Sequence, residues 1–296
     1  MKKLYLIDGS WYLYRAYYAF PEMPDRDGHN INVVYWFFRM LLKLFHDRPD
    51  YFVIARDAPT KTHRHEIYPE YKANRVKAPD DFKTQIPIVQ EVAKKLNVHS
   101  LTIPGYEADD IIASMAKKYK QDKNIMCNIF SSDKDLKQLL DENVIFTDPS
   151  KWTQYKTKDF VQEYLFDPIY ILDYLALIWD SADNIKWVPW IWPKWASTLI
   201  QKYQTIENIY NHIDEISGWI KEKLIQWKEE CFKAKWLISL QDVPEVNFIS
   251  LQEYQFDIDF NKYLEILVKE QNFVSMEKAI TELKNKFHMP QQSSLF

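Results

Sequence analysis

Five short apolar runs, separated by stretches with helical periodicity, limit the folds open to the first half of the chain. Each run is bounded by polar or turn residues, which is typical of a buried strand. The runs are residues 3–8, 51–55, 98–103, 125–130 and 143–146. Strands that alternate with helices usually pair in parallel, so the pattern predicts an α/β domain with a mainly parallel sheet.

The pattern changes after about residue 150. Helical stretches broken by prolines follow, and no clear strand is seen. We therefore predict an α/β core over residues 1–160 and a helical second domain over residues 161–287. A flexible tail is expected at residues 288–296.

Composition excludes several classes of protein. The 296 residues are 47% apolar, which is enough for a large core, and the net charge of −4 argues against a protein that coats nucleic acid nonspecifically. Cys127 and Cys231 lack metal-site spacing, so buried thiols are expected. No leader peptide and no membrane-spanning apolar run is found, which predicts a cytoplasmic protein without a membrane partner.

Residues 60–79 (TKTHRHEIYPEYKANRVKAP) combine cations with aromatic rings. Arg64, Lys72 and Arg75 alternate there with Tyr68 and Tyr71. One interpretation is a solvated loop or exposed helix. The other is a segment whose cations hold phosphates while its rings stack on unpaired bases. The tract alone leaves both open.

Carboxylates gather at the predicted strand ends and helix starts. Enzymes that hydrolyse phosphodiesters without a covalent intermediate usually hold two divalent ions about 4 Å apart, and Mg²⁺ prefers carboxylate and water ligands. Taken singly, an Asp at such a position is more often a helix cap or turn residue. Together, nine acids at successive strand ends predict a site for two metal ions. They are Asp8, Asp57, Glu107, Asp109, Asp110, Asp133, Asp135, Asp180 and Asp183.

Five segments carry a resemblance to a known family. They are LIDGSWYLYRAYYAF, RHEIYPEYKANR, GYEADDIIASMAKK, SSDKDLKQLL and LALIWDSADNIKWVPWIWPKWA. In this order they resemble the signature segments of the 5′-nuclease (5′-3′ exonuclease) domain of bacterial DNA polymerase I, of the flap endonuclease family. The resemblance runs to about Phe287.

This resemblance implies an α/β nuclease core with a helical arch near residues 60–90, followed by a helix–three-turn–helix domain that grips duplex DNA with a K⁺ ion. The nine acids would bind two Mg²⁺ ions, or Mn²⁺ in their place. Lys72 and Arg75 would engage the scissile phosphate, and Tyr71 would stack on the terminal base. Arg15 and Arg64 would lie near the DNA path. The duplex-binding turn would include Trp187, Trp190, Trp192, Lys194 and Trp195.

The implied substrates are branched, nicked or flapped DNA and RNA-primed DNA. Two alternatives stay open: a non-catalytic DNA-junction binding protein, and an RNA-cleaving nuclease on a related core. Residues Gln292–Phe296 resemble the short peptide by which replication enzymes bind the sliding clamp. A disordered polar tail would look similar.

The chain departs from the family in its glycines and tryptophans. It has only four glycines and eleven tryptophans, and several tryptophans stand in the duplex-binding turn, where the family uses glycine. Genuine aromatic contacts with bases or protein are one explanation. Our hypothesis is that the gene uses UGA for glycine and was translated with UGA as tryptophan. UGG codons at several of these positions would contradict it.

Overall fold

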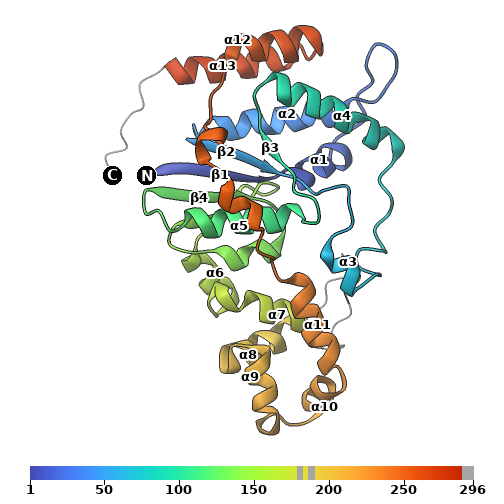
Figure 1. Cartoon of the computed structure of the whole chain (residues 1–296), viewed down its shortest axis with the longest axis vertical. Helices are drawn as coiled ribbons and strands as arrows, with labels where there is room; N and C mark the ends of the chain where they lie inside the picture. The colour runs from blue at the N-terminus through green and yellow to red at the C-terminus, as the bar shows by residue number, and fades with distance from the viewer. Residues whose placement is uncertain (179–182, 186–190, 289–296) are drawn as a thin grey trace.

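The computed structural model describes residues 1–178, 183–185 and 191–288. Its centre is a six-stranded sheet with the strand order β3-β2-β1-β4-β5-β6 (Figure 1). The strands are β1 (Lys2–Asp8), β2 (Tyr51–Ala55), β3 (Ser100–Leu101), β4 (Ile125–Phe130), β5 (Val144–Asp148) and β6 (Thr153–Tyr155). Every pairing is parallel except that of β5 with β6. The predicted α/β class is confirmed.

Alternate residues of the central strands pack into two separate hydrophobic cores, one on each face of the sheet. On β1, Leu4 and Leu6 belong to one buried cluster, whereas Tyr5 and Ile7 belong to the other. Successive side chains of a strand point to opposite faces, so a run that is apolar throughout requires helices on both faces of the sheet.

Two groups of helices supply that cover. On one face lie α1 (Gly9–Tyr18), α2 (Asn32–Phe45), α4 (Asp80–Lys95), α12 (Phe260–Tyr263), the π-helical segment η6 (Leu264–Glu270) and α13 (Met276–His288). On the other lie α5 (Ala108–Tyr119) and the 3-10 helix η1 (Lys134–Leu139). Figure 1 shows α12 and α13 beyond α2, with α5 on the opposite side of the sheet.

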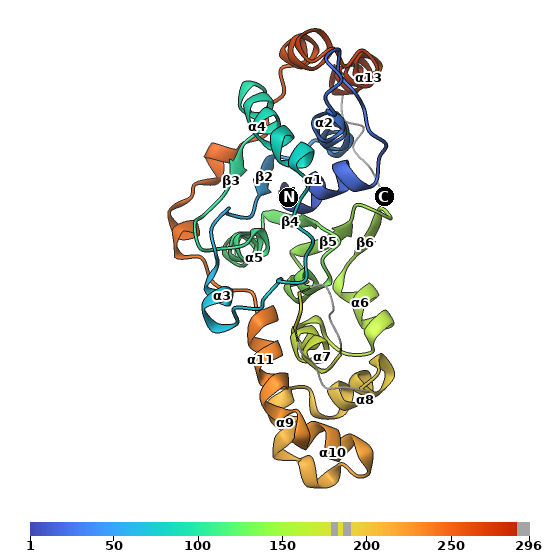
Figure 2. The same ribbon diagram turned by 90° about the vertical axis from the view of Figure 1, so that its right-hand side faces the viewer.

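A helical half extends from the α5 side of the sheet (Figures 1 and 2). It contains α6 (Thr157–Tyr164), η2 (Pro168–Tyr170), α7 (Ile171–Leu177), α8 (Pro193–Tyr203), α9 (Ile206–Asn211), η3 (Ile213–Glu215), α10 (Trp219–Gln226) and α11 (Lys228–Ile238). The chain then returns along the core through η4 (Pro244–Phe248) and η5 (Leu251–Tyr254). Short helix α3 (His63–Ile67) lies beside the end of α11.

The structure differs from the sequence prediction at two points. Residues 260–288 do not continue the helical half, because α13 packs against α2 on the far side of the sheet. The apolar stripe of α13, formed by Met276, Ile280 and Leu283, is visible in the sequence, but its partner is not. Strand β6 was also missed, because this short edge strand has no apolar run.

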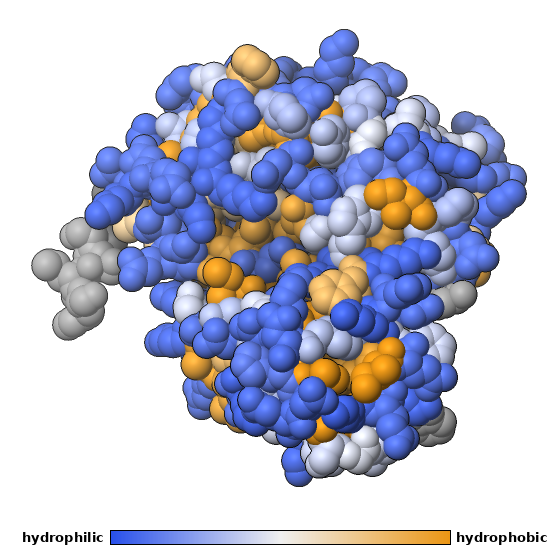
Figure 3. Space-filling model, turned by 60° about the horizontal axis from the view of Figure 1, so that its bottom comes forward, coloured by the Kyte–Doolittle hydropathy of each residue, from blue (hydrophilic) through white to orange (hydrophobic). Residues whose placement is uncertain are grey.

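The surface carries no large apolar area in the view from the lower end. Small hydrophobic patches are separated by hydrophilic side chains there (Figure 3). Within the described part of the chain, no helix has the length and apolar character needed to cross a membrane.

Candidate active site

The strand order places the candidate site at the carboxyl ends of β1 and β4. The chain moves outward from β1 to β2 and β3 in one direction, then returns to add β4 on the other side of β1. Open α/β sheets bind ligands in the crevice at such a reversal of strand order. Asp8 ends β1, and Asp133 follows β4 by three residues.

Asp8 is a helix cap as well as a cleft residue. Its Oδ1 accepts a hydrogen bond from the Trp11 backbone N–H at 2.9 Å, which caps α1, and its Oδ2 accepts from Ser131 Oγ at 2.7 Å. Burial, with a smaller contribution from the charges of Asp57 and Asp133, raises the pKa of Asp8 to about 7 despite these hydrogen bonds. A carboxyl in this environment gains strongly from a cation beside it.

The other strand-end acids are fixed by backbone contacts. Asp57 donates its N–H to Ser10 Oγ at 3.0 Å and accepts from the Ala108 N–H at 2.8 Å, which joins the end of β2 to the start of α5. Asp133 accepts from the Asp135 N–H at 2.9 Å and so caps η1. The capping and site interpretations of these acids are therefore compatible.

A cleft of about 500 Å³ brings seven of the nine predicted acids together. It is lined by Asp8, Asp57, Glu107, Asp109, Asp133, Asp135 and Asp183, together with Lys72 and Arg75. Asp180 lies outside the described residues. Burial, and then the charge of the adjacent Asp110, raises the pKa of Asp109. Such crowding of like charge favours cation binding.

The cleft acids surround a broad space. Among the described residues, only Asp25, Asp27 and His29 have metal-ligand atoms that all lie within 4.8 Å of one another, and they occupy an exposed turn. The cleft carboxylates therefore do not form a tight cage in this structure.

Two cations from the segment after α3 enter the cleft. Lys72 Nζ lies 2.9 Å from Glu107 Oε2, and Arg75 Nη2 lies 2.5 Å from Asp183 Oδ1. The Lys72 backbone N–H also donates to the Asp183 carbonyl at 3.1 Å. The segment is thus held across the cleft, with its cations paired to candidate metal ligands.

Tyr71 does not have the exposure that base stacking requires. The residue is 3% exposed, and its hydroxyl shares its proton between Glu107 Oε2 at 3.1 Å and Asp183 Oδ2 at 3.2 Å. By contrast Tyr14, which we did not predict, lines the cleft and is 44% exposed. The sequence did hold a signal for an aromatic helix face at this position. Trp11, Tyr14 and Tyr18 are three or four residues apart, and residues at this spacing share one face of a helix.

Arg64 and Asp110 also lie elsewhere than predicted. Arg64 is 1% exposed and forms a buried ion pair with Asp110, which is itself fully buried and does not line the cleft. The expected contact of Arg64 with DNA is therefore not available in this structure. Arg15 lines a different pocket, of about 360 Å³, together with residues of α2 and α13.

The described part of the duplex-binding turn is at the surface. Trp192 and Trp195 are 63% and 44% exposed at the start of α8, and Lys194 between them is exposed. Trp187 and Trp190 lie outside the described residues.

None of the eight tryptophans in the described segments is buried. One of them, Trp152, has a φ of 55°, which favours glycine. The backbone at Trp152 therefore agrees with the hypothesis that glycine belongs at that position.

The sheet is mainly parallel, and an acidic cleft lies where its strand order reverses. A cationic segment crosses this cleft. Together these features define an α/β nuclease. Residues 3–165 match the model of the 5′-3′ exonuclease N-terminal resolvase-like domain, and residues 166–258 match that of the 5′-3′ exonuclease C-terminal SAM fold. The chain belongs to the 5′-3′ exonuclease family.

Similar proteins agree with this assignment. A 5′-3′ exonuclease of Aquifex aeolicus is 36% identical over the full length of both chains. DNA polymerase I of Bacillus subtilis is 32% identical over 96% of this chain, which spans only 34% of that polymerase. The fold is similar to that of the bacteriophage T5 D15 flap endonuclease, solved as a pseudo-enzyme–product complex with DNA and metal ions (TM-score 0.68, 19% identity, 96% and 100% of the two chains).

Proposed function

We propose that this chain is a structure-selective 5′ nuclease that cuts flapped, nicked and RNA-primed DNA with two Mg²⁺ ions, or Mn²⁺ in their place. The observation that carries the proposal is the placement of seven carboxylates and two arch cations in one cleft. Placing so many negative charges in one cleft costs free energy, and a non-catalytic junction-binding protein would not require it.

The residues of the cleft fit divalent ions in their chemistry. All candidate ligands are carboxylate oxygens, which suit Mg²⁺ and Mn²⁺, and neither buried thiol lines the cleft. When bound, the ions would polarise the scissile phosphate and lower the pKa of a water ligand. Burial and the nearby carboxylates raise the pKa of Asp8, so a cation beside it would favour its ionised form.

The chain's own residues would hold the ions and orient the phosphate. Arg64, Tyr71 and Lys72 all contact Glu107 Oε2 and so fix this carboxylate at the cleft. Lys72 and Arg75 would exchange their carboxylate partners for the phosphate, because charge-assisted hydrogen bonds to phosphate are equally strong. Tyr14 would stack on a base at the rim.

Three parts of the proposal rest on the sequence and its resemblances alone. The turn that would bind duplex DNA and K⁺ includes residues 187–190, which lie outside the described residues. The clamp-binding peptide Gln292–Phe296 lies outside them as well. Location in the cytoplasm is the third. All three stay predictions.

Cleavage of a labelled 5′-flap DNA, with and without Mg²⁺, tests the proposal. The chain with its eleven tryptophans is compared with a chain that carries glycine at all eleven positions. Asp8→Asn, made in whichever of the two chains cleaves, serves as the control. We expect Mg²⁺-dependent cleavage that Asp8→Asn abolishes. Flap binding without cleavage by either chain would favour the junction-binding alternative, and faster cleavage of an RNA hairpin than of the flap would favour the RNA nuclease.

A further inference from the structure

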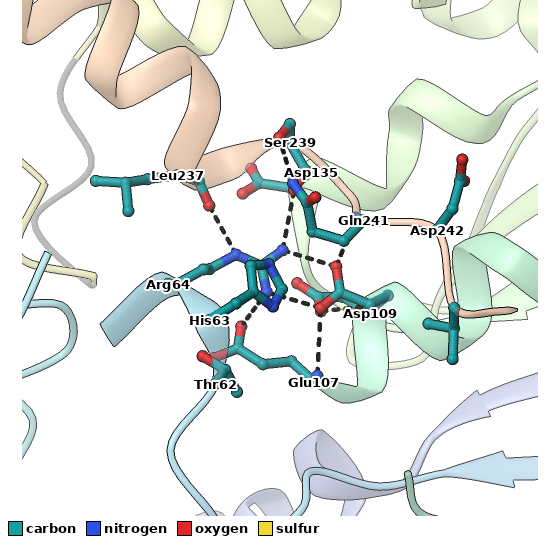
Figure 4. A network of polar contacts seen from close by, with 12 residues as sticks. Thr62, His63, Arg64, Glu107, Asp109, Asp135, Leu237, Ser239, Gln241 and Asp242 are labelled. Atoms are coloured by element: carbon teal, nitrogen blue, oxygen red, sulfur yellow. Dashed lines mark hydrogen bonds and ion pairs between the residues drawn. The ribbon is translucent and has the colours of Figure 1, made fainter. Parts of the chain in front are cut away.

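The guanidinium of Arg64 forms five hydrogen bonds inside the protein. Nη1 and Nη2 each bind one carboxylate oxygen of Asp110 at 2.7 Å, and Nη1 also lies 3.2 Å from Glu107 Oε2. Nε donates to the Leu237 carbonyl and Nη2 to the Ser239 carbonyl, both at 2.9 Å. Figure 4 shows Arg64 reaching from α3 toward these partners.

These partners belong to three elements that are far apart in the sequence. Arg64 is on α3, Asp110 is in the first turn of α5, and Leu237 and Ser239 are at the end of α11. The carbonyl end of a helix carries partial negative charge, so a buried cation is favourable there. We call this contact between α3, α5 and the end of α11 the junction. Asp110 Oδ1 adds to the junction by accepting a hydrogen bond from the Gln241 N–H at 2.8 Å.

We propose that Arg64 is a positioning residue that orients Glu107 through the base of α5 and links this ligand to the helical half, without touching DNA. The inference rests on the proposed metal site, because Glu107 is one of its ligands. Arg64 is fully surrounded by protein, so it acts through the residues that it holds.

The physical reason lies in the charge balance at the base of α5. Glu107 and Asp110 are both almost completely buried, and the Glu107 N–H donates to Asp110 Oδ2 at 3.3 Å. Without Arg64, two buried carboxylates would lie close together, with Lys72 and the Tyr71 hydroxyl beside Glu107. Repulsion would then turn Glu107 away from its present orientation. Residues that hold metal ligands typically contribute about 10- to 100-fold in metal affinity.

The junction also links the two halves of the molecule. Helix α11 packs against α7 in the helical half, and its last carbonyls bind Arg64. If α11 shifts when the helical half binds duplex DNA, Arg64 would therefore transmit the movement and change the position of Glu107. The family resemblance implied a place near the DNA path for Arg64, but direct contact with phosphate would require it to break five hydrogen bonds to four residues.

The test separates positioning from simple loss of stability. Arg64→Met leaves Asp110 buried without its partner, so this variant is expected to be unstable. Arg64→Met combined with Asp110→Asn removes both charges and is expected to regain melting temperature. Mn²⁺ affinity is measured by calorimetry without DNA, and flap affinity is measured in EDTA at several salt concentrations. Arg26→Met, at an exposed arginine, is the matched control.

We expect the double variant to bind Mn²⁺ about 10- to 100-fold more weakly than the parent while its flap binding keeps the same salt dependence. Unchanged Mn²⁺ affinity in a folded double variant would overturn the positioning role. A salt slope that falls by about one unit would show that Arg64 contacts phosphate, again contradicting the inference. Absence of saturable Mn²⁺ binding in the parent chain would instead overturn the proposed metal site.

Discussion

Gly9→Ala is expected to damage both stability and cleavage, because Gly9 sits where α1 meets the end of β2. A Cβ at this position would lie 2.5 Å from Ile54 Cγ2, 2.9 Å from the Ala55 carbonyl oxygen and 2.9 Å from Arg56 Cγ. Carbon atoms in contact are ordinarily separated by about 3.5 Å or more, so the added methyl group overlaps by roughly 1 Å. Because one of these atoms is backbone, α1 has to move.

The magnitude follows from the kind of overlap. Overpacking in a well-packed core costs about 1–3 kcal/mol in the free energy of unfolding. For a chain of this size each kcal/mol lowers the melting temperature by about 2–4 °C. The displacement also moves Asp8 relative to Asp57, and misplacement of reacting groups by 1 Å can lower a rate by about 100-fold.

Thermal melting and single-turnover cleavage of a 5′ flap measure the two effects. Gly28→Ala is the matched control, because Gly28 has a φ of 85° but no atom within 4 Å of an added Cβ. We expect it to lose about 1–2 kcal/mol through its left-handed backbone and to cut at the parent rate. Parent-like melting and cleavage by Gly9→Ala would refute the close packing of α1 on β2.

Three further predictions concern other parts of the molecule. Lys72→Ala is expected to lower the single-turnover cleavage rate by about 100- to 1000-fold, the usual effect of losing one charge-stabilising donor, and a rate within threefold would remove Lys72 from the site. Asp173→Asn should lower the free energy of unfolding by about 1–3 kcal/mol in denaturant titrations, because the buried Asp173 lies 2.5 Å from Lys235 Nζ; an unchanged midpoint would contradict this. Burial raises the pKa of Cys127 and of Cys231 to about 12, so neither thiol should be alkylated at pH 8 before unfolding, and rapid labelling of the native chain would show that one is accessible.

Several site residues could be predicted because their signal is local. Asp8 and Asp133 follow apolar runs, and the carboxyl ends of parallel strands meet at one edge of the sheet. Lys72 and Arg75 were identified by their family motif, and the structure places both in the cleft. Tyr14 was missed because an aromatic residue on a helix is usually part of the core.

Other residues could not be placed because their environment comes from distant segments. The family resemblance placed Arg64 near the DNA path, and arginine is in general rarely buried. Its burial depends on carbonyl groups about 170 residues later in the chain. Tyr71 lies next to Lys72, yet its hydroxyl turns inward to Glu107 and Asp183. The exposure of Tyr71 is therefore set by the distant residues that it contacts and not by its position beside Lys72.

The sequence by itself determined the parallel sheet, the set of acids and the family, because strand periodicity and residue type are properties of short segments. Tertiary structure alone decided which acids share the cleft, that Asp110 pairs with Arg64 behind it, and that α13 returns to α2. An amphipathic helix or a charged side chain specifies the kind of partner it needs. Which partner it meets depends on how the whole chain packs.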